Sequence, residues 1–208
     1  QMMKVGRRGS ITTHLTVIGR QGHVAYPLEA SNPATPIVKI LNELKSKPLD
    51  KGNKNFQPSN LEITKINIDN SADNVIPARA SATFNIRYNT LHTFNSLKKN
   101  ISKIIKKYEK KYKFRSQIQF QGTGTAFLTK PNAMVKKIQS IMSKETKQRT
   151  ALSTIGGTSD ARFIKDIAPC VEFGLVGNTM HQVDERTSVK DMKKLKSIYL
   201  KIIKSFFS

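Results

Sequence analysis

Residues 78–88 read Ala-Arg-Ala-Ser-Ala-Thr-Phe-Asn-Ile-Arg-Tyr, and this stretch decides the fold. Apolar and polar residues alternate along it, so that one face carries Ala80, Ala82, Phe84, Ile86 and Tyr88. The other face carries Arg79, Ser81, Thr83, Asn85 and Arg87. A period of two is typical of a strand with one buried face. The segment therefore predicts a strand that buries its aromatic residues and presents arginine on its polar side.

The elements around this strand complete a recognisable order. Alternating or β-branched residues predict strands at 10–18, 61–68 and 115–120, with a bulge near Lys65 where the alternation slips. Asn32 and Pro33 resemble a helix start, and the apolar stripe that follows is Ile37, Ile40, Leu41 and Leu44. A second, lysine-rich helix is expected over 94–112. The order strand-helix-strand-strand-helix-strand predicts a ferredoxin-like domain over residues 9–121.

A second region follows a Gly-Thr-Gly-Thr linker at residues 122–125. Helices are expected at 132–145, at 160–166 and after Ser188, where Ser188 to Asp191 has the form of a capping box. Short strands are expected at 150–154 and 169–174. This alternation predicts an α/β region whose sheet is incomplete within the chain. We therefore expect a hinge at 1–8, the ferredoxin-like domain at 9–121 and part of an α/β domain at 122–208.

Composition limits the cellular setting and the partners. No apolar run approaches the ~18 residues of a membrane span, so no membrane partner is expected. The single cysteine, Cys170, cannot form an internal disulfide, and its apolar neighbours favour a packing role over a nucleophilic one. We expect a cytoplasmic protein. The first residue, Gln1, is not a translation start, so we expect a chain that is processed, engineered or cut from a longer protein.

The net charge of +22 raises the alternative of nucleic-acid binding. The lysines are spread over the whole chain, and between residues 94 and 112 they take the face opposite the apolar stripe, as in a solvated helix. An RNA-binding ferredoxin-like module stacks bases on strand aromatics. Here Phe84 and Tyr88 lie on the apolar face, so no nucleic-acid partner is expected, and an RNA-binding module stays open as an alternative function.

Three loops carry candidate chemistry. Residues 153–160 form a glycine turn before a predicted helix, which suits either anion binding or ordinary capping by Thr158 or Ser159. His181 follows the last predicted strand, where α/β proteins collect ligands, although a lone histidine is more often structural. If it binds a metal, its co-ligands lie outside this sequence. His23 lies in a loop where it either aims an N–H at developing negative charge or faces solvent.

Five arginines are candidate carboxylate partners, because a guanidinium matches a carboxylate in two-point geometry. They are Arg7, Arg8, Arg20, Arg79 and Arg87. Arg87 is singled out because it lies on the polar face of the best-defined strand. Asn74, just before that strand, serves either a site or a turn.

Six segments together resemble one family. They are Gly-Arg-Arg-Gly-Ser (6–10), Gly-His-Val-Ala-Tyr-Pro (22–27), Asn-Val-Ile-Pro (74–77), Phe-Asn-Ile-Arg (84–87), Gly-Gly-Thr-Ser-Asp (156–160) and Met-His-Gln-Val-Asp-Glu (180–185). Their order and spacing resemble the succinyl-diaminopimelate desuccinylases, within the aminoacylase/carboxypeptidase-type zinc peptidases. The resemblance implies a ferredoxin-like lid and dimerisation domain followed by the C-terminal part of the zinc-peptidase α/β catalytic domain.

The resemblance also implies an activity and roles for particular residues. The family hydrolyses N-succinyl-LL-2,6-diaminopimelate, a small polycarboxylate, with two zinc ions (cobalt is possible) and an upstream glutamate as base. His181 matches a zinc ligand, and His23 matches the lid histidine that stabilises the oxyanion in the partner subunit of a homodimer. The residues that match positions around the substrate are Arg7, Tyr26, Asn74, Arg87, Gly157, Thr158 and Asn178.

Part of the family's catalytic machinery has no counterpart in these 208 residues. The segments that carry the other zinc ligands and the base are absent, which predicts an incomplete and inactive fragment. The nearest alternative within the same superfamily is an acetylornithine deacetylase or an aminoacylase-like enzyme.

Overall fold

The computed structural model describes residues 2–122, 124–175 and 177–207. The chain divides into two compact units. The first, which we call the lid unit, contains Arg8–Phe127 and Gly156–Thr158. The second, which we call the terminal unit, contains Gln1–Arg7, Leu128–Ile155 and Ser159–Ser208. Each unit has its own hydrophobic core.

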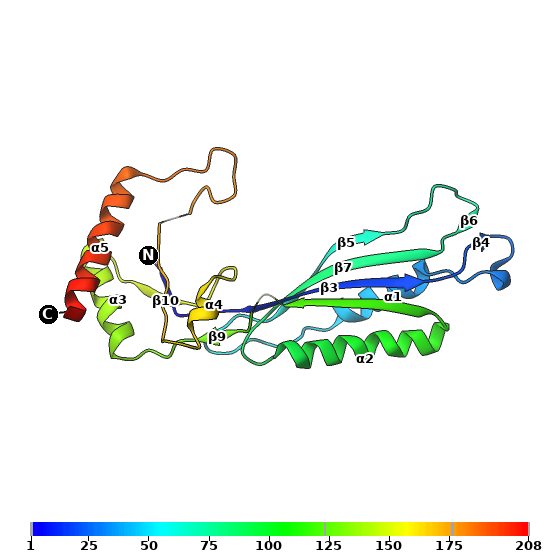
Figure 1. The fold of residues 1–208 in the computed structure, drawn as a ribbon, viewed down its shortest axis with the longest axis horizontal. Coiled ribbons are helices and arrows are strands. Elements are labelled where there is room, and N and C mark those ends of the chain that lie inside the picture. The colour runs from blue at the N-terminus through cyan, green and yellow to red at the C-terminus, as the bar shows by residue number, and fades with distance from the viewer. Residues whose placement is uncertain (1, 123, 176, 208) are drawn as a thin grey trace. The chain divides into compact units, whose positions relative to one another are not determined.

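The lid unit is built on a four-stranded antiparallel sheet in the order β5-β7-β3-β8 (Figure 1). The strands are β3 (Gly9–Ile18), β5 (Asn60–Asn67), β7 (Arg79–Tyr88) and β8 (Arg115–Gly122). In chain order this is the 4-1-3-2 arrangement of a ferredoxin-like fold, which confirms the predicted fold class. The predicted bulge is also present, because the β5–β7 register shifts between Ile63 and Lys65.

Two helices, α1 (Ala34–Ser46) and α2 (Phe94–Tyr112), cover the apolar face of this sheet. The predicted stripe of α1 is buried, and Leu97, Ile101 and Ile105 of α2 pack beside it. Phe84 and Tyr88 are 0% and 1% exposed in the same core. They are therefore not available for base stacking, which removes the feature that the RNA-binding alternative required.

A small extension closes one end of the lid sheet, beyond the C-terminal end of β3 and the start of β7 (Figure 1). It contains β4 (Gly22–His23), the short 3₁₀ helix η1 (Pro27–Glu29) and β6 (Val75–Ile76). β4 pairs antiparallel with β6, so that Gly22 faces Ile76 and His23 faces Val75. We call this extension the tip. It brings residues that are some fifty positions apart in sequence into one place.

Gly9 fixes the opposite end of the sheet. It pairs with Tyr88, and a Cβ atom at Gly9 would lie 2.2 Å from the Tyr88 ring. No other residue type fits against a side chain that is itself buried and whose hydroxyl donates to the Gly124 carbonyl at 3.2 Å. The glycine therefore allows β3 to begin in register, directly after Arg8.

A polar cluster around Asp50 holds the loop before β5 against the end of β7. The Asp50 carboxylate accepts hydrogen bonds from the Gly52 and Ser59 backbone N–H groups and from the Asn89 amide at 2.8 Å. Nε2 of His92 lies 3.0 Å from Oδ2 of Asp50. Although burial raises the pKa of Asp50, hydrogen bonds from Ser59, Gly52 and Asn89 hold it at about 2.

The terminal unit combines short strands with helices. β1 (Met2–Lys4) pairs in parallel with β10 (Ala151–Ser153). Around this pair lie α3 (Ala133–Thr146), α4 (Ala161–Ile164) and α5 (Val189–Phe207), and their core contains Met3, Val135, Ile138, Met142 and Ile198. β2 (Gly6–Arg7) and β9 (Phe127–Leu128) lie where the chain passes between the units. None of the helices described has the length and apolar character that a bilayer crossing demands.

The structure corrects several local predictions. α1 begins one residue later than predicted, with Pro33 at the cap and Asn32 accepting from the Ala34 N–H at 2.9 Å. α4 is a single turn instead of a helix over 160–166. The predicted strand at 169–174 is wrong, since only Glu172 forms a bridge, to Lys4. The expected hinge at 1–8 contains β1, which is the partner strand of β10. The sequence did not predict this strand, because three residues are too few to show an alternation of apolar and polar side chains.

The Asp50 cluster predicts a pH-dependent contribution to stability. Because the folded pKa of about 2 lies below the ordinary 3.8, Asp50 stabilises the fold above about pH 4, and this stabilisation is lost as the pH falls toward 2. Asp50→Asn is expected to lower the free energy of unfolding by about 2 kcal/mol at pH 7, and by less below pH 4. Urea unfolding at several pH values measures both. Asp69→Asn, in an exposed loop, is the control, and an equal deficit at pH 3 and pH 7 contradicts the prediction.

Candidate functional site

The tip gathers three of the predicted site residues. His23 lies in β4, Tyr26 precedes η1, and Asn74 precedes β6. The Asn74 carbonyl accepts from the Val24 N–H at 3.0 Å, and the rings of His23 and Tyr26 lie 5.7 Å apart. All three residues are exposed. The β4–β6 pairing therefore brings the exposed residues His23, Tyr26 and Asn74 into one small part of the fold.

The local backbone fixes the direction in which His23 can donate. The Ala25 N–H donates to Nδ1 of His23 at 3.1 Å. Nδ1 is then the acceptor of the neutral ring, so the proton resides on Nε2. Nε2 has no hydrogen-bond partner among the described residues and can donate outward. This arrangement suits a group that stabilises developing negative charge on a ligand oxygen.

Arg87 lies near the far end of β7, on the polar face, between Ser10 of β3 and Asn60 of β5. Its guanidinium makes no hydrogen bond or ion pair within the described part of the chain. Eight residues of extended strand separate it from Arg79, which borders the tip. At about 3.4 Å per residue this separation is roughly 27 Å. Within one lid unit, Arg87 and His23 therefore cannot contact the same small molecule.

Arg7 has a partner in the terminal unit. Its Nε donates to Oε2 of Glu172 at 2.7 Å, and both side chains are largely buried, at 15% and 27% exposed. Lys4 lies nearby, and its pKa is lowered by burial and by the charge of Arg7. Glu172 thus neutralises part of a small cationic group. Sequence reasoning missed this glutamate because it lies far from Arg7 in the chain.

The glycine turn does not form the helix-terminus site that its sequence allowed. Gly157 is exposed, with open space where a Cβ atom would stand, and Thr158 is half-buried. No side chain caps α4, and one turn of helix has little dipole to offer an anion. The Ser159 hydroxyl is buried without a hydrogen-bond partner among the described residues. The turn therefore offers backbone groups and one unpaired hydroxyl, without a preformed anion cradle.

His181 and Asn178 lie in the exposed loop before α5. Thr179 ties this loop together, because its hydroxyl accepts from the Arg186 N–H at 3.0 Å and donates to the Arg186 carbonyl at 3.1 Å. His181 has a φ of 61° and Asp184 a φ of 62°, in the left-handed region that non-glycine residues seldom adopt. Such conformations are often found at functional sites.

The loop fits a metal ion only in part. The His181 ring is exposed and has no hydrogen-bond partner among the described residues, so an imidazole nitrogen is free to bind. Glu185 instead accepts from the His181 N–H at 3.2 Å. No group of three or more potential metal ligands occurs among residues 2–122, 124–175 and 177–207. This chain can therefore supply one imidazole to a metal whose other ligands come from elsewhere.

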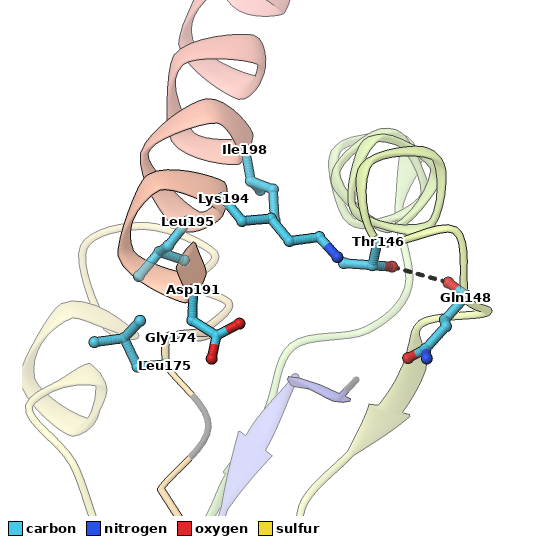
Figure 2. Close-up of a pocket in the computed structure, with 8 residues that line it drawn as sticks. All are labelled: Thr146, Gln148, Gly174, Leu175, Asp191, Lys194, Leu195 and Ile198. Atoms are coloured by element: carbon cyan, nitrogen blue, oxygen red, sulfur yellow. Dashed lines mark hydrogen bonds between the residues drawn. The ribbon is translucent and has the colours of Figure 1, made fainter. Parts of the chain in front are cut away.

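Two cavities contain none of the predicted site residues. One of about 210 Å³ lies in the terminal unit between the end of α3, residues 174–175 and the start of α5 (Figure 2). The charged residues that line it are Asp191 and Lys194. A groove of about 600 Å³ lies between α1 and α2 in the lid unit. Neither places a nucleophile, an acid–base pair or a metal ligand set around a ligand.

Cys170 takes no part in the candidate site. Its thiol lies 3.7 Å from the Ala161 carbonyl, and burial raises its pKa. Because the thiolate is disfavoured, the structure agrees with a packing role.

Comparisons with known proteins agree with this fold. A family model described as a peptidase dimerisation domain, M20_dimer, matches residues 5–113. A tripeptidase structure from Staphylococcus aureus superposes with a TM-score of 0.82 over 98% of this chain and 53% of its own, at 21% identity. An M20 family metallo-carboxypeptidase from Sulfolobus solfataricus gives 0.75 over 98% and 59%, at 15% identity. At these identities the structures support the fold alone.

Curated relatives are much closer in sequence. A succinyl-diaminopimelate desuccinylase of Pelagibacter ubique is 59% identical over all of this chain and 54% of its own length. The desuccinylase of Methylorubrum populi is 47% identical over the same shares. The chain thus spans about half the length of these relatives. It belongs to the M20 peptidase family, whose dimerisation domain it contains, and resembles the succinyl-diaminopimelate desuccinylases along its whole length.

Proposed function

We propose that this chain is the lid and C-terminal part of an amide hydrolase that cleaves N-succinyl-LL-2,6-diaminopimelate to succinate and LL-diaminopimelate. The observation that carries the proposal is the 59% identity to the Pelagibacter desuccinylase over the whole chain. The exposed cluster at the tip supports it, because its groups suit binding of a polar substrate and its oxyanion. The half of the relatives' length that this chain lacks would supply the base and the remaining metal ligands.

The proposed metal is zinc, with two ions in the complete subunit and cobalt as a possible substitute. His181 would hold one of them, because a free imidazole nitrogen on a tied loop suits zinc. A bound divalent ion supplies an activated water and polarises the amide carbonyl. The loop would position the His181 ring for this role. The Thr179 hydroxyl closes the loop by accepting from the Arg186 N–H, and the Glu185 carboxylate accepts from the His181 N–H.

In the proposed mechanism His23 donates from Nε2 to the oxygen that becomes negative as the amide carbonyl is attacked. The Ala25 N–H holds the ring in the tautomer that this donation needs. Tyr26 and Asn74, beside it, would contact the substrate, and Arg87 would bind a carboxylate. The proposed substrate contacts also include Arg7, Gly157, Thr158 and Asn178.

We further propose a homodimer formed through the lid unit. The separation of roughly 27 Å between the tip and Arg87 supports it, because a second subunit can bring its own tip to a site that its partner cannot complete. The cytoplasm remains the predicted location.

Substrate preference in the full-length protein tests the function. We expect kcat/KM for the N-succinyl substrate to exceed that for N-acetylornithine and for N-acetyl amino acids by about a hundredfold or more, because a site that binds a carboxylate rejects the analogue that lacks it. Stopped assays of the released amine measure all three. A preference for either acetyl donor would instead support the acetylornithine deacetylase or aminoacylase alternative.

His181→Ala in the full-length protein is expected to remove one metal ion per subunit and to lower kcat. The physical reason is the loss of one imidazole from a ligand set that the rest of the chain cannot replace. Metal analysis after dialysis measures the loss, and His14→Ala, in the lid sheet, is the control. Two tightly retained ions in the variant would exclude His181 from the metal shell.

His23→Ala is expected to lower kcat by roughly 10²–10³-fold with unchanged metal content, since one oxyanion donor is lost. His23→Gln, which keeps an N–H donor, should recover part of the rate. A parallel loss of metal would contradict the role.

A mixture of the two inactive variants tests whether His23 acts across the dimer. When His23→Ala and His181→Ala subunits are exchanged in equal amounts, half of the dimers are mixed and one of their two sites is intact. Activity should return to roughly a quarter of the wild-type value. No recovery, with mixed dimers verified, would mean that His23 acts within its own subunit.

A further inference from the structure

Arg8 and Arg87 form a pair of cations without a counter-ion. Arg8 immediately precedes β3, two residues before Ser10, and Ser10 pairs with Arg87 across the sheet. Asn60 pairs with Arg87 across the sheet and accepts a hydrogen bond from Arg8, so both arginines border the same residue. Burial and then the charge of Arg87 lower the pKa of Arg8. Neither makes an ion pair with any carboxylate in the described part of the chain.

Arg8 is held in place by neutral groups alone. Its Nη1 donates to Oδ1 of Asn60 at 2.8 Å. With the Gln57 amide oxygen turned toward it, Gln57 accepts from Nη1 and Nη2, both at 3.1 Å. Its Nε is buried and has no hydrogen-bond partner among the described residues. The side chain is thus fixed in position, but its charge is not compensated.

Two acidic residues of the neighbouring segments, Glu62 and Asp50, are already engaged. Glu62 lies beyond Asn60 on the same strand face, but it pairs with Lys45 at 2.7 Å and is more than half exposed. The oxygens of Asp50 are taken up by Gly52, Ser59, Asn89 and His92. In contrast, the adjacent Arg7 has Glu172. Two neighbouring like charges, one of them fixed by neutral amides alone, indicate a place where an anion is expected to bind.

Resting on the proposed function, we propose that Arg8 and Arg87 together bind a free carboxylate of the substrate. Arg87, whose N–H groups have no partner among the described residues, offers the two-point fork. Arg8, fixed by Asn60 and Gln57, adds a second positive charge that a single guanidinium lacks. This pair would distinguish a dicarboxylic acyl group, or the dicarboxylate amine, from analogues with one carboxylate fewer.

The test compares Arg8→Gln, Arg8→Lys and Arg115→Gln in the full-length protein. Arg8→Gln is expected to raise KM for the N-succinyl substrate by roughly tenfold to a hundredfold, with kcat changed less than threefold, because a charged hydrogen-bonding group is lost. Arg8→Lys, which keeps the charge and loses the fork, should lie between. Arg115→Gln, a control at an exposed residue that begins β8, should leave KM unchanged. Unfolding curves verify that each variant folds.

Product binding identifies which carboxylate is bound and does not depend on the reaction. Calorimetric titrations compare succinate with acetate, and diaminopimelate with lysine, against wild type and Arg8→Gln. A loss of preference for succinate assigns the acyl end, and a loss of preference for diaminopimelate assigns the amine end. If Arg8→Gln changes neither preference and KM stays within twofold, the pair is not a carboxylate site. If wild type binds dicarboxylates through Arg8 but cleaves no succinyl amide, the proposed function fails and the site stands.

Discussion

The antiparallel pairing of β3 with β7, from Gly9–Tyr88 to Ile18–Arg79, is the constraint on which the rest of the lid unit depends. Because side chains alternate across a strand, this single register assigns Ile11, Leu15 and Val17 of β3 and all the apolar residues of β7 to the helix-covered face. It also places Ser10 opposite Arg87 on the polar face. A shift by one residue would exchange the two faces. Gly9 helps to fix the register, because a Cβ atom at this position would lie 2.2 Å from the Tyr88 ring and only glycine avoids this clash.

The length of β3 and β7 separates two groups of candidate site residues. Strands of ten residues carry the tip to one end of the sheet and Arg87 to the other. The tip is small and exposed, and its β4–β6 pairing holds His23, Tyr26 and Asn74 in one cluster. A rigid sheet therefore acts as a spacer between two groups of polar side chains. This separation is the physical basis for the proposed site that two subunits would complete together.

Neighbouring arginines in Gly-Arg-Arg-Gly are treated differently by the fold. Arg7 faces Glu172 in the terminal unit, whereas Arg8 faces only the amides of Asn60 and Gln57 in the lid unit. Alternation along an extended chain sends the two side chains in opposite directions. One charge is neutralised as part of the framework, and the other is kept uncompensated beside Arg87. The Asp50 cluster contributes indirectly to the position of Arg8. Its hydrogen bond from the Ser59 N–H fixes the loop that contains Gln57 and leads to Asn60.

The sequence by itself determined the lid: the periods of 78–88 and 94–112 predict β7 and α2 nearly residue by residue, because long amphipathic elements repeat their pattern several times. It also identified His23 and His181 as candidates from residue type and loop context, and Arg87 from its place on the polar face of a strand. Only the tertiary structure decided which residues of the chain lie together. The partner of Arg7, the pairing of β1 with β10 and the closeness of Arg8 to Arg87 depend on contacts between distant segments, and a local pattern carries no record of such contacts.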